Sequence, residues 1–160
     1  MVDGPPFLTD TEDRAWRGIL ALWHLGFPEI ERVLKPWGLL HIEYGILAVL
    51  NMQSERTLRL GRLAALAGMS PSRLTYRLRR LIERGLVERI ESDEDGRVAL
   101  AQLTAKGANL VAAVSPAHFA QIRSMIFDRL DQTQVEALAG AMQTIAAGLT
   151  REEWWLVAAD

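Results

Sequence analysis

The sequence predicts a mainly helical protein with one small β-hairpin. The hairpin comes directly after a helix-turn-helix pattern, at the position that a wing has after the recognition helix. Apolar residues recur at helical spacing over most of the 160 residues. Two short helical segments are joined by a tight turn at Gly68, and two strand-like runs flank turn-forming residues over 92–96. A chain of this length buries roughly two-thirds of its unfolded surface, so we expect a single domain over 1–160.

Composition and motifs exclude several classes of function. The sequence contains no cysteine, which excludes disulfides, cysteine nucleophiles and thiol-based redox sensing. His24, His41 and His118 lie far apart in the sequence without the spacing of helical ligands, so no metal is expected. We find no glycine-rich phosphate loop or nucleophile elbow, and therefore expect neither an enzyme nor a cofactor. No apolar run approaches the ~18 residues of a membrane span, and residues 1–5 lack a basic region, so we expect a cytoplasmic protein without membrane contact.

Charge is unevenly distributed along the chain, although the net charge is only −2. Residues 56–97 carry ten arginines and six acidic residues, whereas the segments on either side are net acidic. The stretch 56–82 holds seven arginines and no acidic residue. A local basic field of this kind is typical of a surface that binds phosphates, although a solvated helix face gives the same pattern.

The first third of the chain predicts two helical segments. Thr9 followed by Glu12 has the spacing of a capping box and predicts the start of the first. A kink or break is expected near Pro28, because proline removes a backbone hydrogen bond. The Pro-Trp-Gly run at 36–38 ends this segment, and residues 40–52 predict a nearly all-apolar helix suited to a buried position.

Residues 56–85 carry the helix-turn-helix pattern. Residues 56–60 are too short for a helix and predict a brief strand, and residues 61–67 predict a short helix. Gly68 follows this helix at the position where left-handed backbone is favoured. Ser70 and the proline after it then start a second helix as N-cap and first residue, and Gly85 stops it.

At about 100° per residue, this second helix has one apolar face and one polar face. We expect Leu74, Leu78, Leu81 and Ile82 to be buried. The polar face carries hydroxyl, phenol and guanidinium groups, which helix-turn-helix proteins place in the DNA major groove; its members are Ser72, Arg73, Tyr76, Arg79 and Arg80. An ordinary amphipathic surface helix would explain the leucines, but not the absence of acidic residues before Glu83.

The hairpin over 86–103 predicts a wing. Arg97 lies near its tip, where an arginine can enter the minor groove. The alternative is an exposed charge that pairs with neighbouring acidic residues, among them Asp95.

Two more helices are expected after the wing. The first begins at Thr104 with a distortion at Pro116, and the second begins at Asp131 or Thr133. The pair Trp154-Trp155 is expected to pack on a neighbouring helix or on a partner subunit. The last helix has a single apolar stripe made of Val135, Leu138, Met142, Ile145 and Leu149.

From about residue 40 to residue 149, the chain resembles the MarR family of bacterial transcriptional regulators. The resemblance is specific in the order and spacing of its positions, which are Tyr44, Leu47, Leu58-Arg59, Leu63-Ala64, Ser70, Ser72-Arg73, Thr75, Leu81, Gly85-Leu86-Val87, Arg89, Asp95, Arg97, Leu103-Thr104 and Gly107. The sequence departs from the family pattern at Leu40 and Gly61, where the family often has a hydroxyl cap. Arg77 occupies a position that is often apolar, where it adds a potential phosphate contact.

The resemblance implies a winged helix-turn-helix lobe at 40–103 and dimerisation helices at 1–38 and 104–160, which interleave in an obligate homodimer. It implies a transcriptional regulator, expected to be a repressor, that binds a pseudo-palindromic double-stranded operator. Arg97 would enter the minor groove with Asp95 bracing the wing. The predicted DNA-binding residues are Arg59, Ser70, Pro71, Ser72, Arg73, Thr75, Tyr76, Arg77, Arg79, Arg80, Asp95 and Arg97.

The resemblance also implies a small aromatic or phenolic effector, bound between the dimerisation helices and the DNA-binding lobe, that relieves repression. The candidate lining residues are Trp16, Trp23, His24, Trp37, His41 and Tyr44. The alternative is that these aromatic residues only pack the core and the dimer. For the whole protein, the alternative is a winged-helix module whose basic helix binds an acidic protein partner without sequence-specific DNA binding.

Overall fold

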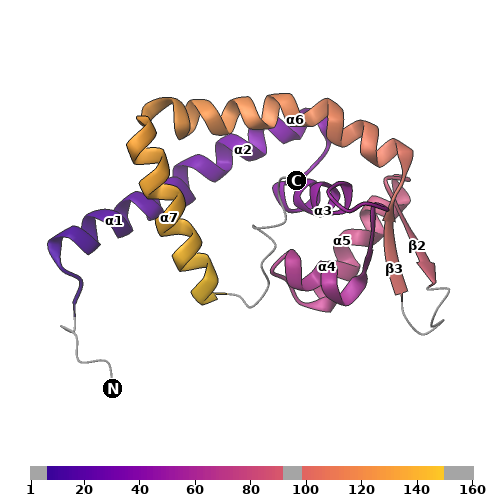
Figure 1. Ribbon diagram of the computed structural model, residues 1–160. Helices are drawn as coiled ribbons and strands as arrows, with labels where there is room; N and C mark the ends of the chain where they lie inside the picture. Colours follow the sequence, from indigo (N-terminus) through magenta and orange to yellow (C-terminus); the bar gives the residue numbers. More distant parts are fainter. Residues whose placement is uncertain (1–6, 92–98, 150–160) are drawn as a thin grey trace, which may run out of the picture.

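The computed structural model describes residues 7–91 and 99–149, and comprises a long helical arm beside a compact lobe (Figure 1). The arm contains α1 (Asp10–Ala21), α2 (Phe27–Leu34) and much of α6 (Ala105–Met125), with α7 (Gln132–Leu149) descending from its end. The lobe contains α3 (His41–Asn51), β1 (Thr57–Arg59), α4 (Leu60–Leu66), α5 (Pro71–Glu83), β2 (Val87–Glu91) and β3 (Ala99–Leu103). Asp95, Arg97 and the Trp154-Trp155 pair lie outside the described residues.

The first helix begins at the predicted capping box. Thr9 Oγ1 accepts the backbone N–H of Glu12, and the Glu12 carboxylate accepts the backbone N–H of Thr9 at 2.7 Å. A π-helical turn (Leu22–Gly26) joins α1 to α2 and keeps the chain helical at Pro28. The prediction of a distortion is therefore correct and that of a break is wrong, because the wider π turn makes room for a proline ring within a continuous helix.

The junction between α2 and α3 is a short 3₁₀ turn, Lys35–Trp37, followed by Gly38 in left-handed backbone at φ +63°. Leu40 then occupies the N-cap of α3 without a hydroxyl. Two carboxylates replace the missing cap: Glu43 accepts the backbone N–H of Leu40 at 3.1 Å, and Glu31 of α2 accepts that of His41 at 2.8 Å. The departure from the family pattern at Leu40 is thus compensated within this chain.

The helix-turn-helix follows the predicted pattern. Gly68 and Gly85 have φ values of +61° and +68°, a left-handed backbone that favours glycine. Ser70 Oγ accepts the backbone N–H of Arg73 at 3.4 Å and caps α5. The three strands form an antiparallel sheet in the order β1-β3-β2, in which Ala101 pairs with Leu58 on one side and Arg89 on the other.

The last two helices also begin at predicted caps. Thr104 Oγ1 accepts the backbone N–H of Gly107 at 3.0 Å, and Asp131 Oδ1 accepts that of Gln134 at 2.9 Å. Helix α6 continues through Pro116.

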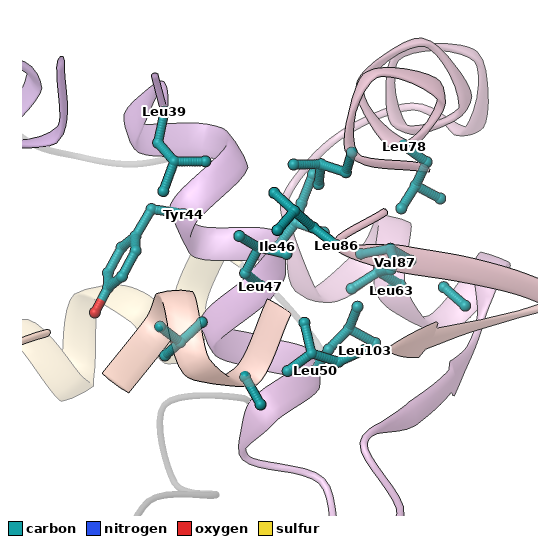
Figure 2. Packing of buried hydrophobic residues seen from close by; sticks show 14 of the residues in the cluster. Leu39, Tyr44, Ile46, Leu47, Leu50, Leu63, Leu78, Leu86, Val87 and Leu103 are labelled. Atoms are coloured by element: carbon teal, nitrogen blue, oxygen red, sulfur yellow. The ribbon is translucent and has the colours of Figure 1, made fainter. Parts of the chain in front are cut away.

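A single buried cluster joins the lobe to the arm (Figure 2). Its members come from α2 through α5, the sheet, and α6, which contributes Ala108, Val111 and Val114. In α5, Leu74, Leu78 and Leu81 are buried as predicted, whereas Ile82 is 38% exposed. Ile82 lies at the edge of the apolar stripe, so the prediction that it is buried is wrong.

The outer helices carry apolar side chains that the lobe does not cover. None of the described residues of α1 or α7 is buried. Their exposed apolar side chains include Trp16, Ile19, Met142, Ile145 and Leu149, the last of which is 81% exposed.

Within 7–91 and 99–149, no single helix is long and apolar enough to cross a membrane. Two helical stretches, Asp10–Trp37 and His41–Asn51, reach the required length and apolar composition only when they are taken together across a bend of 75°.

Candidate nucleic-acid interface

The outward face of α5 presents the polar side chains that the sequence predicts. Ser72, Arg73, Thr75, Tyr76 and Arg79 are all exposed. Ser72 Oγ lies 3.2 Å from Ser70 Oγ, and the Thr75 hydroxyl donates to the carbonyl of Pro71 at 2.9 Å. The threonine hydroxyl therefore keeps its acceptor capacity for an outside donor.

Two guanidinium groups lie close to the ring of Tyr76. The Cζ atoms of Arg77 and Arg79 lie 5.5 Å and 5.7 Å from the centre of its ring, a cation–π geometry. The tyrosine itself is 61% exposed. A shallow hollow beside it, with a volume of about 210 Å³, is lined by Ser72, Arg73, Tyr76 and Arg77. Exposed π and guanidinium groups on an otherwise well-packed helix fit a phosphate and base surface.

The remaining predicted residues lie around this face. Pro71 is the first residue of α5, Arg59 is exposed at the end of β1, and Arg77 is half-buried.

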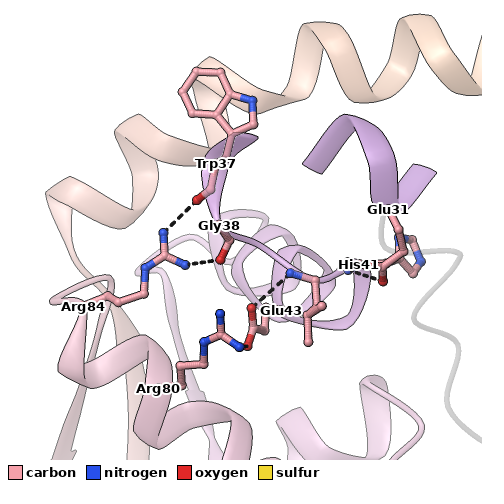
Figure 3. A network of polar contacts seen from close by, with 8 residues as sticks. Glu31, Trp37, Gly38, His41, Glu43, Arg80 and Arg84 are labelled. Atoms are coloured by element: carbon pink, nitrogen blue, oxygen red, sulfur yellow. Dashed lines mark hydrogen bonds and ion pairs between the residues drawn. The ribbon is translucent and has the colours of Figure 1, made fainter. Parts of the chain in front are cut away.

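Arg80 lies differently from the other predicted DNA-binding arginines, because its guanidinium is engaged within the protein. Its Nη1 atom lies 3.5 Å from Oε1 of Glu43, which is fully buried, whereas the Arg80 side chain is 51% exposed (Figure 3). Helical periodicity places Arg80 on the polar side of α5 but does not indicate that α3 packs there. An acidic residue in the nearly all-apolar segment 40–52 was a signal for this contact, since a buried carboxylate requires a partner.

Arg84 is a second arginine whose guanidinium is engaged within the protein, and the sequence analysis did not single it out. It caps α5 and is half-buried, and its guanidinium donates to the carbonyl of Gly38 at 2.7 Å and to that of Trp37 at 2.9 Å (Figure 3). Both acceptors are backbone atoms more than 45 residues earlier in the chain, so local spacing carries no signal for the contact.

The structure divides the predicted effector residues among different environments. Trp23 and His24 line an open groove of about 910 Å³ between α2 and the start of α3, together with Phe27, Pro28, Glu31, Arg32, Lys35, Gly38, Leu39, Leu40 and Arg80. Trp16 lies on the exposed surface of α1, and Trp37 is 39% exposed at the junction. Tyr44 is buried, and its hydroxyl lies 3.0 Å from Ser115 Oγ.

His41 and His118 meet in a cluster of aromatic rings where α2, α3 and α6 pack. Their ring centres are 6.1 Å apart, and the His118 ring lies 4.5 Å from that of Tyr44. The Nδ1 atoms of both histidines are buried without a hydrogen-bond partner among the described residues. Packing of α3 against α6 brings together two residues that are distant in sequence. Among the described residues, no group of three or more histidine and acidic side chains could hold a metal ion.

Burial lowers the pKa of both histidines below the ordinary value of 6.5. For His41 the carboxylate of Glu31 partly opposes the effect of burial, and for His118 the nearby His41 adds to it. A depressed histidine pKa means that the unfolded chain binds protons first as the pH falls. The free energy of unfolding should therefore decrease from about pH 6.5 downward, until the folded protein also becomes protonated.

We expect His118→Phe to reduce this pH dependence. Each histidine contributes at most about 1.4 kcal/mol per pH unit, so the difference is measurable by urea unfolding between pH 7.5 and pH 5 at one protein concentration. His24→Asn, which changes an exposed histidine, is the control. Equal pH slopes for wild type and His118→Phe would contradict this assignment.

Comparison with known proteins supports the resemblance. The sequence profile of the MarR family matches residues 37–98. Among curated proteins, the chain is similar to the uncharacterized HTH-type transcriptional regulator YhbI of Bacillus subtilis (strain 168), with 25% identity over 126 residues, 77% of this chain and 80% of that protein.

Two solved structures are similar over nearly the whole chain. AbsC, a MarR family transcriptional regulator from Streptomyces coelicolor, has 33% sequence identity, a TM-score of 0.85, and coverage of 91% of this chain and 98% of that chain. Sco3205, a MarR family transcriptional regulator from the same organism solved in complex with DNA, has 33% identity, a TM-score of 0.87, and coverage of 94% and 95%. The chain therefore belongs to the MarR family of transcriptional regulators, which are DNA-binding proteins and not enzymes.

Proposed function

We propose that this MarR family regulator acts in the cytoplasm as a repressor and binds a pseudo-palindromic operator as a homodimer, with α5 of each chain in the major groove. The observation that carries this proposal is the exposed face of α5, which presents Ser72, Arg73, Tyr76 and Arg79 with no acidic residue from Pro71 to Ile82. Residues near the N-terminus of a recognition helix reach base edges, whereas later arginines reach phosphates. The structure of Sco3205 in complex with DNA supports DNA binding by this chain.

The homodimer is supported by the uncovered apolar faces of α1 and α7. Trp16 is 48% exposed, Ile145 is 48% exposed and Met142 is 42% exposed. Contiguous apolar faces of this kind mark interaction sites, and a second copy of the chain supplies a matching surface. We therefore propose that the helices before residue 38 and after residue 104 form the interface.

The wing and the effector complete the proposal. Arg97 remains a predicted minor-groove contact braced by Asp95, and both lie outside the described residues. The groove beside Trp23 supports a small aromatic or phenolic effector, because it combines the rings of Trp23 and Phe27 with the cationic side chains of Arg32 and Lys35. Its position between α2 and the lobe would let such a ligand relieve repression.

Arg73→Ala tests the base-reading role of α5. A bidentate arginine–guanine contact contributes about 1–3 kcal/mol to discrimination, so we expect an operator affinity roughly 10- to 100-fold lower and a smaller loss on random DNA. Fluorescence anisotropy at one salt concentration measures both. Arg14→Ala, which removes a hydrogen bond to Thr11 on the exposed polar side of α1, serves as the control. Equal losses on operator and random DNA would show that Arg73 contacts only phosphates.

A further inference from the structure

The C-terminal half of α5 is fastened to the junction between α2 and α3. The guanidinium of Arg84 donates one hydrogen bond to the Gly38 carbonyl and one to the Trp37 carbonyl, at 2.7 Å and 2.9 Å (Figure 3). The two donors of one planar group thus hold two successive peptide units. Such a fork fixes orientation as well as distance.

Arg80, which also lies on α5, makes a second attachment to this junction through Glu43 of α3. The Oε2 atom of Glu43 accepts the backbone N–H of Leu40 at 3.1 Å, and its Oε1 atom lies 3.5 Å from Arg80 Nη1. Oε1 has no hydrogen-bond partner among the described residues, so Arg80 is its nearest compensating charge. A fully buried carboxylate that loses its cation is strongly penalised, which favours an arrangement in which α5 stays close to the junction.

The junction is the point where the arm meets the lobe. Residues 37–40 follow α2 and precede α3, and Glu31 of α2 holds the first N–H of α3 at 2.8 Å. Arg80 and Arg84 lie one helical turn apart on α5 and reach this segment from one side. The orientation of α5 relative to α2 is therefore fixed by a small set of charged and backbone contacts in addition to the apolar core.

We propose that Arg84 and the Glu43–Arg80 pair are positioning residues that set the half-site spacing accepted by the dimer. This inference rests on the proposed homodimer, in which the arms join the two chains and each α5 enters one major groove. Adding one base pair between half-sites moves the second groove along the axis by about 3.4 Å and rotates it about the axis. A junction that holds α5 stiffly rejects such a change, whereas a loosened junction tolerates it.

The test uses the full-length protein and a series of duplexes in which the selected half-sites are moved apart or together by one and two base pairs. We expect wild type to lose at least about tenfold in affinity for each altered spacing, because the DNA must deform to restore the fit. Arg84→Met removes both donors and should flatten this preference to less than about threefold, while affinity for a duplex with one half-site stays unchanged. Arg84→Lys, which keeps the positive charge but has a single donor nitrogen, should restore part of the preference.

Two controls separate the inference from simpler explanations. Arg14→Met removes a hydrogen bond to Thr11 on the exposed polar side of α1, which does not involve α5 or the junction, and should keep the wild-type preference. Arg80→Met tests the second attachment independently and keeps the inference testable if Arg84→Met does not fold, as judged by circular dichroism.

A folded Arg84→Met or Arg80→Met variant that loses affinity equally at every spacing would overturn the positioning role. Failure of the proposed function would look different, because wild type itself would then show no preferred sequence or spacing.

Discussion

Gly107→Ala is expected to lower the free energy of unfolding by about 3 kcal/mol, a large fraction of the total for a domain of this size. A Cβ atom at position 107 would overlap the carbonyl oxygen of Leu86 and lie 2.6 Å from Leu103 Cδ1. The carbonyl cannot move aside freely, because the backbone N–H of Thr104 donates to it at 3.1 Å and the Thr104 hydroxyl lies 3.2 Å from it. The substitution would thus push the start of α6 away from the end of α5 and the sheet.

Gly61→Ala is the matched control for this prediction. A Cβ at Gly61, in α4, meets no described atom within 4 Å, so alanine should leave stability unchanged or raise it by up to about 1 kcal/mol. Chemical denaturation of both variants at equal protein concentration measures the difference. Similar effects at the two positions would show that the contact between Gly107 and Leu86 is not tight.

Ile145→Glu is expected to convert the protein to a monomer and to lower operator affinity by at least about 100-fold. The side chain is 48% exposed on the apolar stripe of α7, which we assign to the dimer interface. A carboxylate there would be buried without a partner on association. A monomer also loses the gain in affinity, about 10²–10⁴, that comes from joining two half-site contacts.

Analytical ultracentrifugation and anisotropy measure these two effects separately. Gln143→Glu introduces the same charge on α7 at a position outside the apolar stripe and should remain a dimer. A dimer of wild-type mass in Ile145→Glu would contradict the assignment of α7 to the interface.

The local parts of the fold were predictable from sequence because each depends on a few neighbouring residues. The caps at Thr9, Ser70, Thr104 and Asp131 form as their spacing indicates, since the side chain and the N–H that it accepts are three residues apart. The left-handed glycines likewise stand where the helices end. The sequence predicted a distortion near Pro28 but could not show that it is a π turn, because a proline indicates only that the regular hydrogen bond is lost.

Contacts between elements were the part that the sequence did not reveal. Periodicity grouped Arg80 with the outward residues of α5, but α3 packs close enough for the Glu43 carboxylate to engage it. The carbonyls that bind Arg84 carry no side-chain signal at all. His41 and His118 come together only because α3 and α6 are neighbours, a relation that no spacing within either helix encodes.

The most direct test of sequence-specific binding by a dimer is selection of bound duplexes from a random DNA library at near-physiological salt. We expect enrichment of an inverted repeat whose half-sites are about ten base pairs apart, one helical turn, so that both α5 helices meet the same face of the DNA. Recovery of no motif, with only salt-labile binding, would contradict this function and favour a winged-helix module that binds an acidic protein partner.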